Sequence, residues 1–275
     1  GTDPSDATKW TLLGVYETGK PLGRRCMIKY GADLIVLTDS GFVPMTKALV
    51  AEDDVSISLS ENIKNAVHSS SRLYGSNFGW QAVMNSSSQM LLFNVPIKTT
   101  PVSEQYVMNT GTGAWCKFTG WNASCWEEHN GDLYFGANTL VCKALSGFAD
   151  NTANVVADAQ QAYSYFRPRS RTKLFTMVRP IFLSDGTPQP QINLTTNFQD
   201  EAPISTPTTS TVTGSPWDTS SWDDTSWTPE ELIFDSWAGT SGEGYSASVR
   251  FKLETRTSTI SWLSTDWSYS IGGVI

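Results

Sequence analysis

The stretch that most constrains the fold is residues 105–145, which contains several very short apolar runs separated by turn signals. The clearest of these signals is Asn130-Gly131, between the runs that end at His129 and begin at Asp132. Asn-Gly between apolar runs predicts a tight β-hairpin, because both residues tolerate the positive φ that such a turn requires. Short strands repeated at this spacing predict an all-β sandwich, barrel or propeller.

An earlier segment repeats the pattern of this stretch. Residues 27–37 and 126–135 each contain a strand, a tight turn, an Asp-Leu pair and a further apolar run, in that order. Lys47-Ala48-Leu49 then matches Lys143-Ala144-Leu145. A repeated turn-Asp-Leu-strand unit favours stacked or radial β repeats. Two interpretations remain open, propeller-like blades and an irregular β-sandwich.

The N-terminal part of the chain divides into sets of about four strands, the size of one propeller blade. The first set is 10–16, 25–30, 33–37 and 42–45, the second is 80–84, 90–95, 105–108 and 114–118, and the third begins at Ala123 and ends within 157–166. Between the first two sets, apolar residues at helical spacing predict one short amphipathic helix near 59–69. We therefore expect propeller-like blades of short antiparallel strands over residues 1–154, with a helical insertion.

Beyond about Arg171 the expected strands become longer and alternate apolar with polar residues. The alternation is clearest at Val249, Phe251 and Leu253 against Arg250, Lys252 and Glu254. That pattern is typical of a half-solvated antiparallel strand. We expect a β-sandwich-like domain over 155–275, interrupted by a Ser/Thr/Pro/Trp-rich loop at 203–231.

Composition and motifs argue against catalysis. The chain has 27 acidic against 19 basic residues, a net charge of −8, which disfavours a general electrostatic footprint for nucleic acid. It contains none of the G-x-S-x-G, Walker, H-E-x-x-H or C-x-x-C patterns. His68 is expected at a helix end and His129 in a turn, and the acidic pairs 53–54, 127–128 and 223–224 on solvated faces. The sequence predicts no enzyme, no catalytic residues and no cofactor.

The four cysteines are Cys26, Cys116, Cys125 and Cys142. They show no C-x-x-C spacing, which favours buried, reduced thiols over a zinc site or a disulfide framework, and no metal is expected. The sequence also has no apolar run of transmembrane length, and membrane insertion is not expected.

Two groups of residues are candidates for an interface. Trp217, Trp222 and Trp227 recur at a period of five in a polar loop. Exposed tryptophans are costly, so they either pack back on their own domain or dock a neighbouring subunit.

The second group is the basic cluster 167–173, which includes Arg167, Arg169 and Arg171. It is interpreted as a solvated loop, as a contact for an acidic partner or adjacent subunit, or as a DNA contact. The cluster is expected to lack the interleaved aromatic residues of nucleic-acid readers, which favours the acidic partner over DNA.

The runs LGRRCMIKYGADLIVLTDSGFVPMTKAL, FGWQAVMNSSSQMLLFNVPI and QYVMNTGTGAWCKFTGWNASCWEEHNGDLYFG resemble tail or neck proteins of short-tailed bacteriophages. The Trp-Asp repeat near 217–227 and the C-terminal ISWLSTDWSYSIGGVI are similar to the ends of such proteins. The resemblance implies a distal tail-tube or nozzle protein, with a β-propeller and attached β domains. Because such proteins are longer than 275 residues, we expect this chain, which opens on a turn cluster at Gly1, to be part of a longer polypeptide.

The resemblance implies a non-enzymatic virion structural protein, made in the host cytoplasm and incorporated into the tail. Its copies would form a homo-oligomeric ring and dock other tail or head–tail connector proteins. An acidic channel wall would let DNA pass transiently during ejection, without specific binding. The alternatives are a glycan- or receptor-binding β module that uses the tryptophan loop, and a tail-associated glycan hydrolase.

Overall fold

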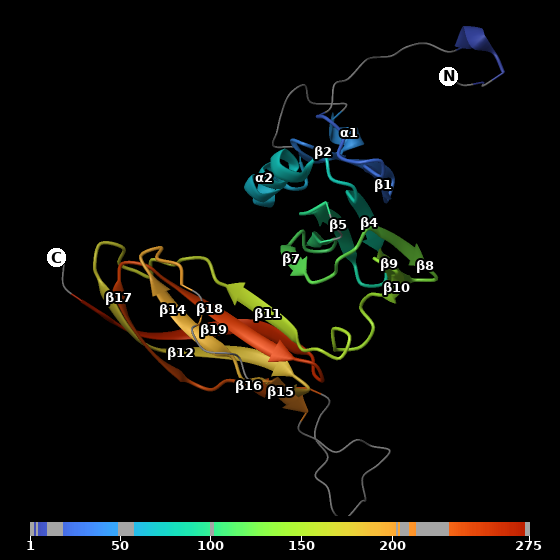
Figure 1. The fold of residues 1–275 in the computed structure, drawn as a ribbon. Helices are drawn as coiled ribbons and strands as arrows, with labels where there is room; N and C mark the ends of the chain where they lie inside the picture. The colour runs from blue at the N-terminus through green and yellow to red at the C-terminus, as the bar shows by residue number, and fades with distance from the viewer. Residues whose placement is uncertain are drawn as a thin grey trace, which may run out of the picture. The chain divides into compact units, whose positions relative to one another are not determined.

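The computed structural model describes residues 3, 5–9, 19–48, 58–99, 102–201, 203, 209–212 and 231–272. The chain is all-β, as the sequence predicts, and antiparallel strands make up most of its regular structure. It divides into two compact units, Gly1–Leu145 and Ser146–Ile275, which are described separately (Figure 1). The division lies nine residues before the expected boundary at 154/155, since 154 − 145 = 9.

The described residues of unit one form three antiparallel sheets, and the strands of each sheet follow one another in chain order. The first sheet is β1 (Met27–Tyr30), β2 (Asp33–Thr38) and β3 (Gly41–Pro44); the second is β4 (Gln81–Asn85), β5 (Met90–Pro96), β6 (Ser103–Asn109) and β7 (Trp115–Thr119); the third is β8 (Cys125–His129), β9 (Asp132–Ala137) and β10 (Leu140–Lys143). Each sheet is therefore a meander, which agrees with the short strands and turn signals of the sequence.

The helical segments of unit one are short. The expected helix is present as a 3-10 turn, η3 (Glu61–Ile63), followed by α2 (Lys64–Tyr74), so it ends five residues later than predicted. Single turns also occur at η1 (Ala7–Lys9) and α1 (Met45–Ala48). No helix in the described part of the chain is long and apolar enough to cross a membrane.

The turn-Asp-Leu pattern of the sequence forms a hairpin with a two-residue turn twice. Asn130 and Gly131 have φ of 54° and 83°, and His129 pairs with Asp132 across them. Tyr30 pairs with Asp33 in the equivalent hairpin of the first sheet. In each case the aspartate also contacts the chain near the end of the third strand. Asp33 accepts a hydrogen bond from Thr46, two residues after β3, and Asp132 forms an ion pair with Lys143, the last residue of β10. The repeat inferred from sequence is therefore a repeat in structure.

The second sheet of unit one is covered on both faces. One face packs against Ile35, Leu37 and Phe42 of the first sheet, together with α2. The other face packs against Trp126 and Leu133 of the third sheet. Successive meanders also pack in this way in a propeller, but propellers contain about four to eight blades. The described residues of unit one form three sheets, and the propeller remains a prediction.

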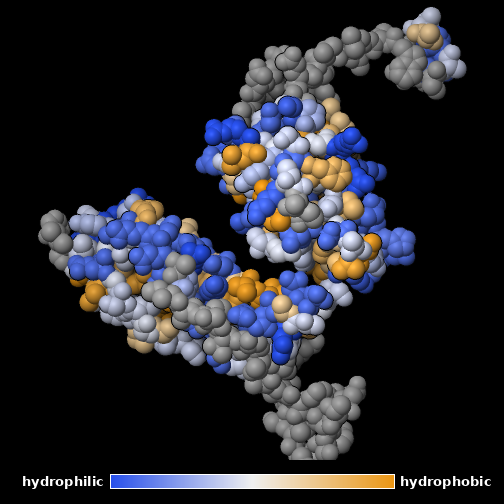
Figure 2. All heavy atoms as spheres, viewed as in Figure 1, coloured by the Kyte–Doolittle hydropathy of each residue, from blue (hydrophilic) through white to orange (hydrophobic). Residues whose placement is uncertain are grey.

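In the described part of unit two, the strands form two sheets. The first contains β11 (Val155–Gln160), β13 (Gly186–Thr187), β14 (Gln191–Thr196), β15 (Thr209–Val212) and β18 (Ala247–Thr255); the second contains β12 (Lys173–Ser184), β16 (Leu232–Phe234), β17 (Ala238–Gly244) and β19 (Ile260–Ile271). The sheets pack face to face, because Val249, Phe251 and Leu253 of β18 share a core with Val178 and Phe182 of β12. Figure 2 shows hydrophobic residues gathered over β11, at the surface of this unit.

Two sequence expectations about strands are wrong. The segment 157–166 was expected to complete the third blade, but its strand is β11, which pairs with β18 of unit two. Strand β17 was not predicted, because its sequence AGTSGEG is rich in glycine and serine. The expected strand at 10–16 lies outside the described residues.

Candidate interaction surface

The arginine loop, residues 165–172, connects the segment that follows β11 to the start of β12. Arg167, Arg169 and Arg171 are all exposed on it. Within the described residues, none of these three guanidinium groups forms a salt bridge. By contrast, Arg179 binds Asp266 and Arg250 binds Asp158. The loop therefore presents positive charge that the described part of the protein does not neutralise.

The buried side chain of Lys173 holds the backbone of the arginine loop through hydrogen bonds. Its side chain is fully buried, and its Nζ donates to the carbonyl oxygens of Pro168 at 2.7 Å, Arg171 at 2.8 Å and Tyr245 at 3.3 Å. These bonds match the three donors of an ammonium group. Burial lowers the pKa of Lys173. The sequence grouped Lys173 with the exposed basic cluster, which is wrong, because the residue is an internal support and not part of the surface.

Phe166 anchors the loop at its other end. Its ring lies 5.3 Å from that of Phe175 and 5.1 Å from those of Trp267 and Tyr269, measured between centroids. Such tilted aromatic contacts add to the stability gained by burial alone. The arginines are thus carried by a segment that is held between Phe166 and Lys173.

Aromatic side chains lie beside the arginines, contrary to the expectation from sequence. The Arg169 guanidinium carbon is 5.2 Å from the centroid of the Tyr165 ring. Phe198, which follows β14, lies 4.4 Å from Tyr163 and 6.2 Å from Tyr165 and is 59% exposed. Guanidinium groups bind carboxylates with two parallel hydrogen bonds, and the rings add apolar contact area. The surface therefore suits an anionic partner.

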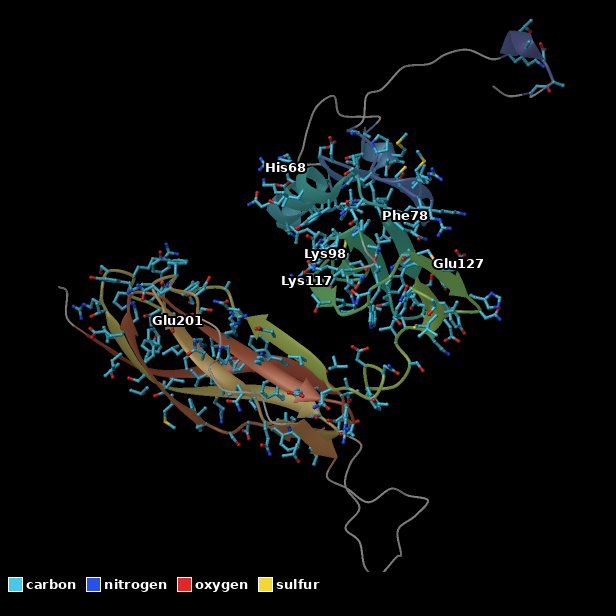
Figure 3. All side chains as sticks on the ribbon, viewed as in Figure 1. His68, Phe78, Lys98, Lys117, Glu127 and Glu201 are labelled. Atoms are coloured by element: carbon cyan, nitrogen blue, oxygen red, sulfur yellow. The ribbon has the colours of Figure 1, made fainter. Side chains whose placement is uncertain are left out.

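The carboxylate of Asp200, beside Tyr163, is already hydrogen-bonded within the protein. Asp200 accepts hydrogen bonds from the Tyr163 hydroxyl and from Gln160 Nε2, and these bonds lower the pKa of its carboxyl. Desolvation raises the pKa of Tyr163, which keeps its hydroxyl protonated as the donor. Figure 3 shows Glu201, the next residue, in the same unit.

The candidate catalytic residues do not form a site. His68 is exposed in the middle of α2 and not at a helix end as expected, while Glu127 lies on β8 (Figure 3). Glu127 and Glu128 are consecutive residues of one strand, so their side chains point to opposite faces. His129 is exposed at the end of β8. Across the ranges that the structure covers, no three His, Cys, Asp or Glu side chains are placed to hold a metal ion.

All four cysteines are free thiols in the structure. Cys26, Cys125 and Cys142 are half-buried, whereas Cys116 is exposed on β7. The expectation of buried thiols is therefore met by none of the four, and it is furthest from the structure at Cys116, which lies on an edge strand.

The tryptophan group falls in a part of the chain that the structure does not describe. Trp217, Trp222 and Trp227, and the acidic pairs 53–54 and 223–224, all lie outside the described residues. The sequence reasoning found the three arginines by composition alone. It missed Lys173 as a support and Phe198 as a neighbour, because both roles depend on contacts with distant parts of the chain.

Comparison with known proteins gives no family: no protein family model matches the sequence, and no curated protein is significantly similar to it. The arginine loop and its surroundings therefore carry the functional inference.

Proposed function

We propose that this chain is a non-enzymatic structural protein of a bacteriophage virion, part of the tail tube or nozzle, whose arginine loop docks an acidic surface. The observation that carries the docking role is the set of three guanidinium groups that form no salt bridge with any described residue, on a loop held by Lys173 and Phe166. A loop that is already ordered loses little conformational entropy when it binds. The partner is a neighbouring copy, another tail protein or a head–tail connector protein.

The virion setting rests on the resemblance of residues 22–49, 78–97 and 105–136 to tail or neck proteins of short-tailed phages. In that setting the copies form a homo-oligomeric ring around a channel. The net charge of −8 disfavours adhesion of DNA to the protein, so DNA would pass without being bound. The protein would be made in the host cytoplasm and become part of the tail.

The test is negative-stain microscopy of the protein and of the triple variant Arg167→Glu, Arg169→Glu, Arg171→Glu. We expect rings for the parent protein and none, or rings that no longer attach to their tail partners, for the variant. The matched control is Lys29→Glu, Arg72→Glu, Lys98→Glu, which makes the same change in net charge at exposed positions of unit one. Normal assembly of the arginine variant would refute the docking role.

The alternative function, a glycan- or receptor-binding module, is favoured by one described observation. Phe198 is an exposed ring tilted against Tyr163, and exposed aromatic rings offer apolar faces to other flat or ring-shaped groups. The measurement is binding of purified host surface polysaccharide to the protein and to Phe198→Ala. Binding that Phe198→Ala abolishes, together with unchanged assembly of the arginine variant, would favour this alternative.

A further inference from the structure

Unit two leaves one side of its sandwich open, between β11 and β19. In the described part of the chain, β11 pairs only with β18, and β19 pairs only with β12. Toward the arginine loop, the Phe166 ring packs against Phe175 of β12 and Trp267 of β19. Along β11, the space between the two sheets holds a cavity of about 270 Å³.

The cavity is almost entirely apolar. Its lining includes Val155, Ala157 and Ala159 of β11, Phe251 and Leu253 of β18, and Trp262 of β19. The Trp262 indole N–H already donates to Ser264 O and Thr265 Oγ1, so it offers no hydrogen bond to an occupant. Protein interiors are close-packed, and a space of this kind at a surface favours an apolar side chain from outside.

The edge of β11 lacks the features that usually protect an edge strand. Its sequence VVADAQ has no lysine and no proline, and its one charge, Asp158, is bound by Arg250 through two hydrogen bonds of 2.7 Å. Val155 and Val156 are 46% and 52% exposed. Natural proteins usually blunt such edges with charge, proline or a covering segment, because unpaired backbone groups template the addition of another strand.

The open edge is continuous with the arginine loop. After β11, the N–H of Gln161 donates to Val249 O and that of Ser164 donates to Ala247 O, both at 2.9 Å. These bonds keep the segment beside β18 until Tyr165, where the arginine loop begins. An extended partner that lies along β11 would therefore meet apolar surface first and unpaired positive charge next.

We propose that β11 accepts an extended strand from another polypeptide, with large apolar side chains at alternate positions and acidic residues at the end near the arginine loop. Side chains on one face of a strand recur at about 7 Å, which is the spacing of Val155, Ala157 and Ala159 on the same face. The strand pairs with the edge of β11 that no described strand occupies, and its apolar side chains fill the cavity. The acidic end rests on the proposed docking role of the loop, whereas the cavity and the edge do not.

A second β11 fits this site poorly. Its inward residues, Val155, Ala157 and Ala159, are small and would leave most of the cavity unfilled. The two antiparallel registers with the longest overlap and matching faces place either Ala157 or Asp158 opposite itself. The first adds no bulk, and the second opposes like charges, which is destabilising.

The probe is a synthetic peptide that begins with aspartate and glutamate and continues with alternating isoleucine and threonine, measured against the full chain by fluorescence anisotropy. The order places the acidic end at the arginine loop when the peptide runs antiparallel to β11. A scrambled peptide of the same composition is the control. We expect tighter binding of the alternating peptide, and slower hydrogen exchange at the β11 amides when it is bound.

The matched variants are Ala157→Trp, which fills the cavity, and Val156→Thr, which changes the opposite face of the same strand. Ala157→Trp should weaken peptide binding at least about tenfold, and Val156→Thr should leave it unchanged. Ala159→Leu, a smaller filling change, serves if Ala157→Trp fails to fold. Equal binding of the two peptides, unchanged exchange at β11, or full affinity in the filled variant would overturn the proposal. A dimer of the free chain that Ala157→Trp dissociates would also overturn it, since a second copy would then be the occupant.

The two proposals fail separately in these experiments. The cavity variants retain all three arginines, so if Ala157→Trp binds the peptide with full affinity, the strand site fails while the docking role of the loop stands. If the arginine variant assembles normally but the alternating peptide still binds through the cavity, the docking role of the loop fails and strand addition stands without its acidic end.

Discussion

At the scale of single residues, unit two uses a buried charge as a structural support. A buried ammonium is costly unless its hydrogen bonds are satisfied. Lys173 has no carboxylate partner in the described part of the chain, and backbone carbonyls take its protons instead. The residue therefore couples the arginine loop to the turn at Tyr245, 72 positions away in the sequence.

Lys173→Met tests this support. The substitution removes the donor of three carbonyl oxygens, and although it also removes a buried charge, we expect the free energy of unfolding to fall by roughly 2–4 kcal/mol. Urea unfolding followed by tryptophan fluorescence measures the change. Leu174→Met, at a neighbouring exposed position, is the control and should be neutral. A Lys173→Met protein as stable as the parent would show that the three bonds give no net stabilisation.

At the scale of elements, the sequence predicts hairpins and alternating strands because these depend on adjacent residues. The Asn130-Gly131 hairpin is confirmed by its φ angles, and the alternation of β18 by its buried Val249 and Phe251. Strand β17 could not be predicted in the same way. A Cβ on Gly242 would lie 2.9 Å from Leu194 Cδ2 and 3.1 Å from Thr196 Cγ2, so glycine leaves room for the side chains of β14, while local propensity indicates a loop.

The arginine loop, too, could be predicted from the sequence only in part. Arg167, Arg169 and Arg171 are visible as a cluster in an acidic sequence, but the residues that order them are not. Strands β11 and β14 pair with the two edges of the same strand, β18. This arrangement brings Phe198, which follows β14, against Tyr163, which follows β11. No spacing pattern in the sequence encodes that approach, since it follows from the pairing of the sheet.

Gln81 shows how a polar side chain joins elements inside unit one. It is 8% exposed, its Nε2 donates to Trp126 O at 2.7 Å, and its Oε1 accepts from the Trp126 N–H at 3.0 Å. The Gln81 side-chain amide thus bonds both backbone groups of Trp126, as the backbone of a neighbouring strand would, and joins β4 to β8. Gln81→Leu would leave both backbone groups of Trp126 unpaired in a buried position.

We expect Gln81→Leu to lower the free energy of unfolding by about 2–4 kcal/mol, because buried unpaired backbone groups cost about 1–3 kcal/mol each. Chemical denaturation of the full chain measures it. Gln199→Leu makes the same change at an exposed position of unit two and should have little effect. If both variants lose equal stability, the loss comes from adding leucine and not from the bridge to β8.

At the scale of the whole molecule, each unit has its own hydrophobic cores. The two cores of unit one contain only residues before 146, and the core of unit two contains only residues after it. The connection between Leu145 and Thr152 is exposed throughout. Units with separate cores and an exposed connection are expected to fold independently.

The fragment 146–275 should therefore fold alone and keep the arginine loop and the β11 edge. Scanning calorimetry should show one cooperative transition for the fragment, at the temperature of one of two transitions in the full chain. The fragment should also bind the acidic alternating peptide as tightly as the full chain does, because the residues assigned to that site lie within it. A matching fragment 1–145 with no affinity for the peptide is the control. If the fragment melts well below both transitions of the full chain, the units stabilise each other and the separation of their cores does not make them independent.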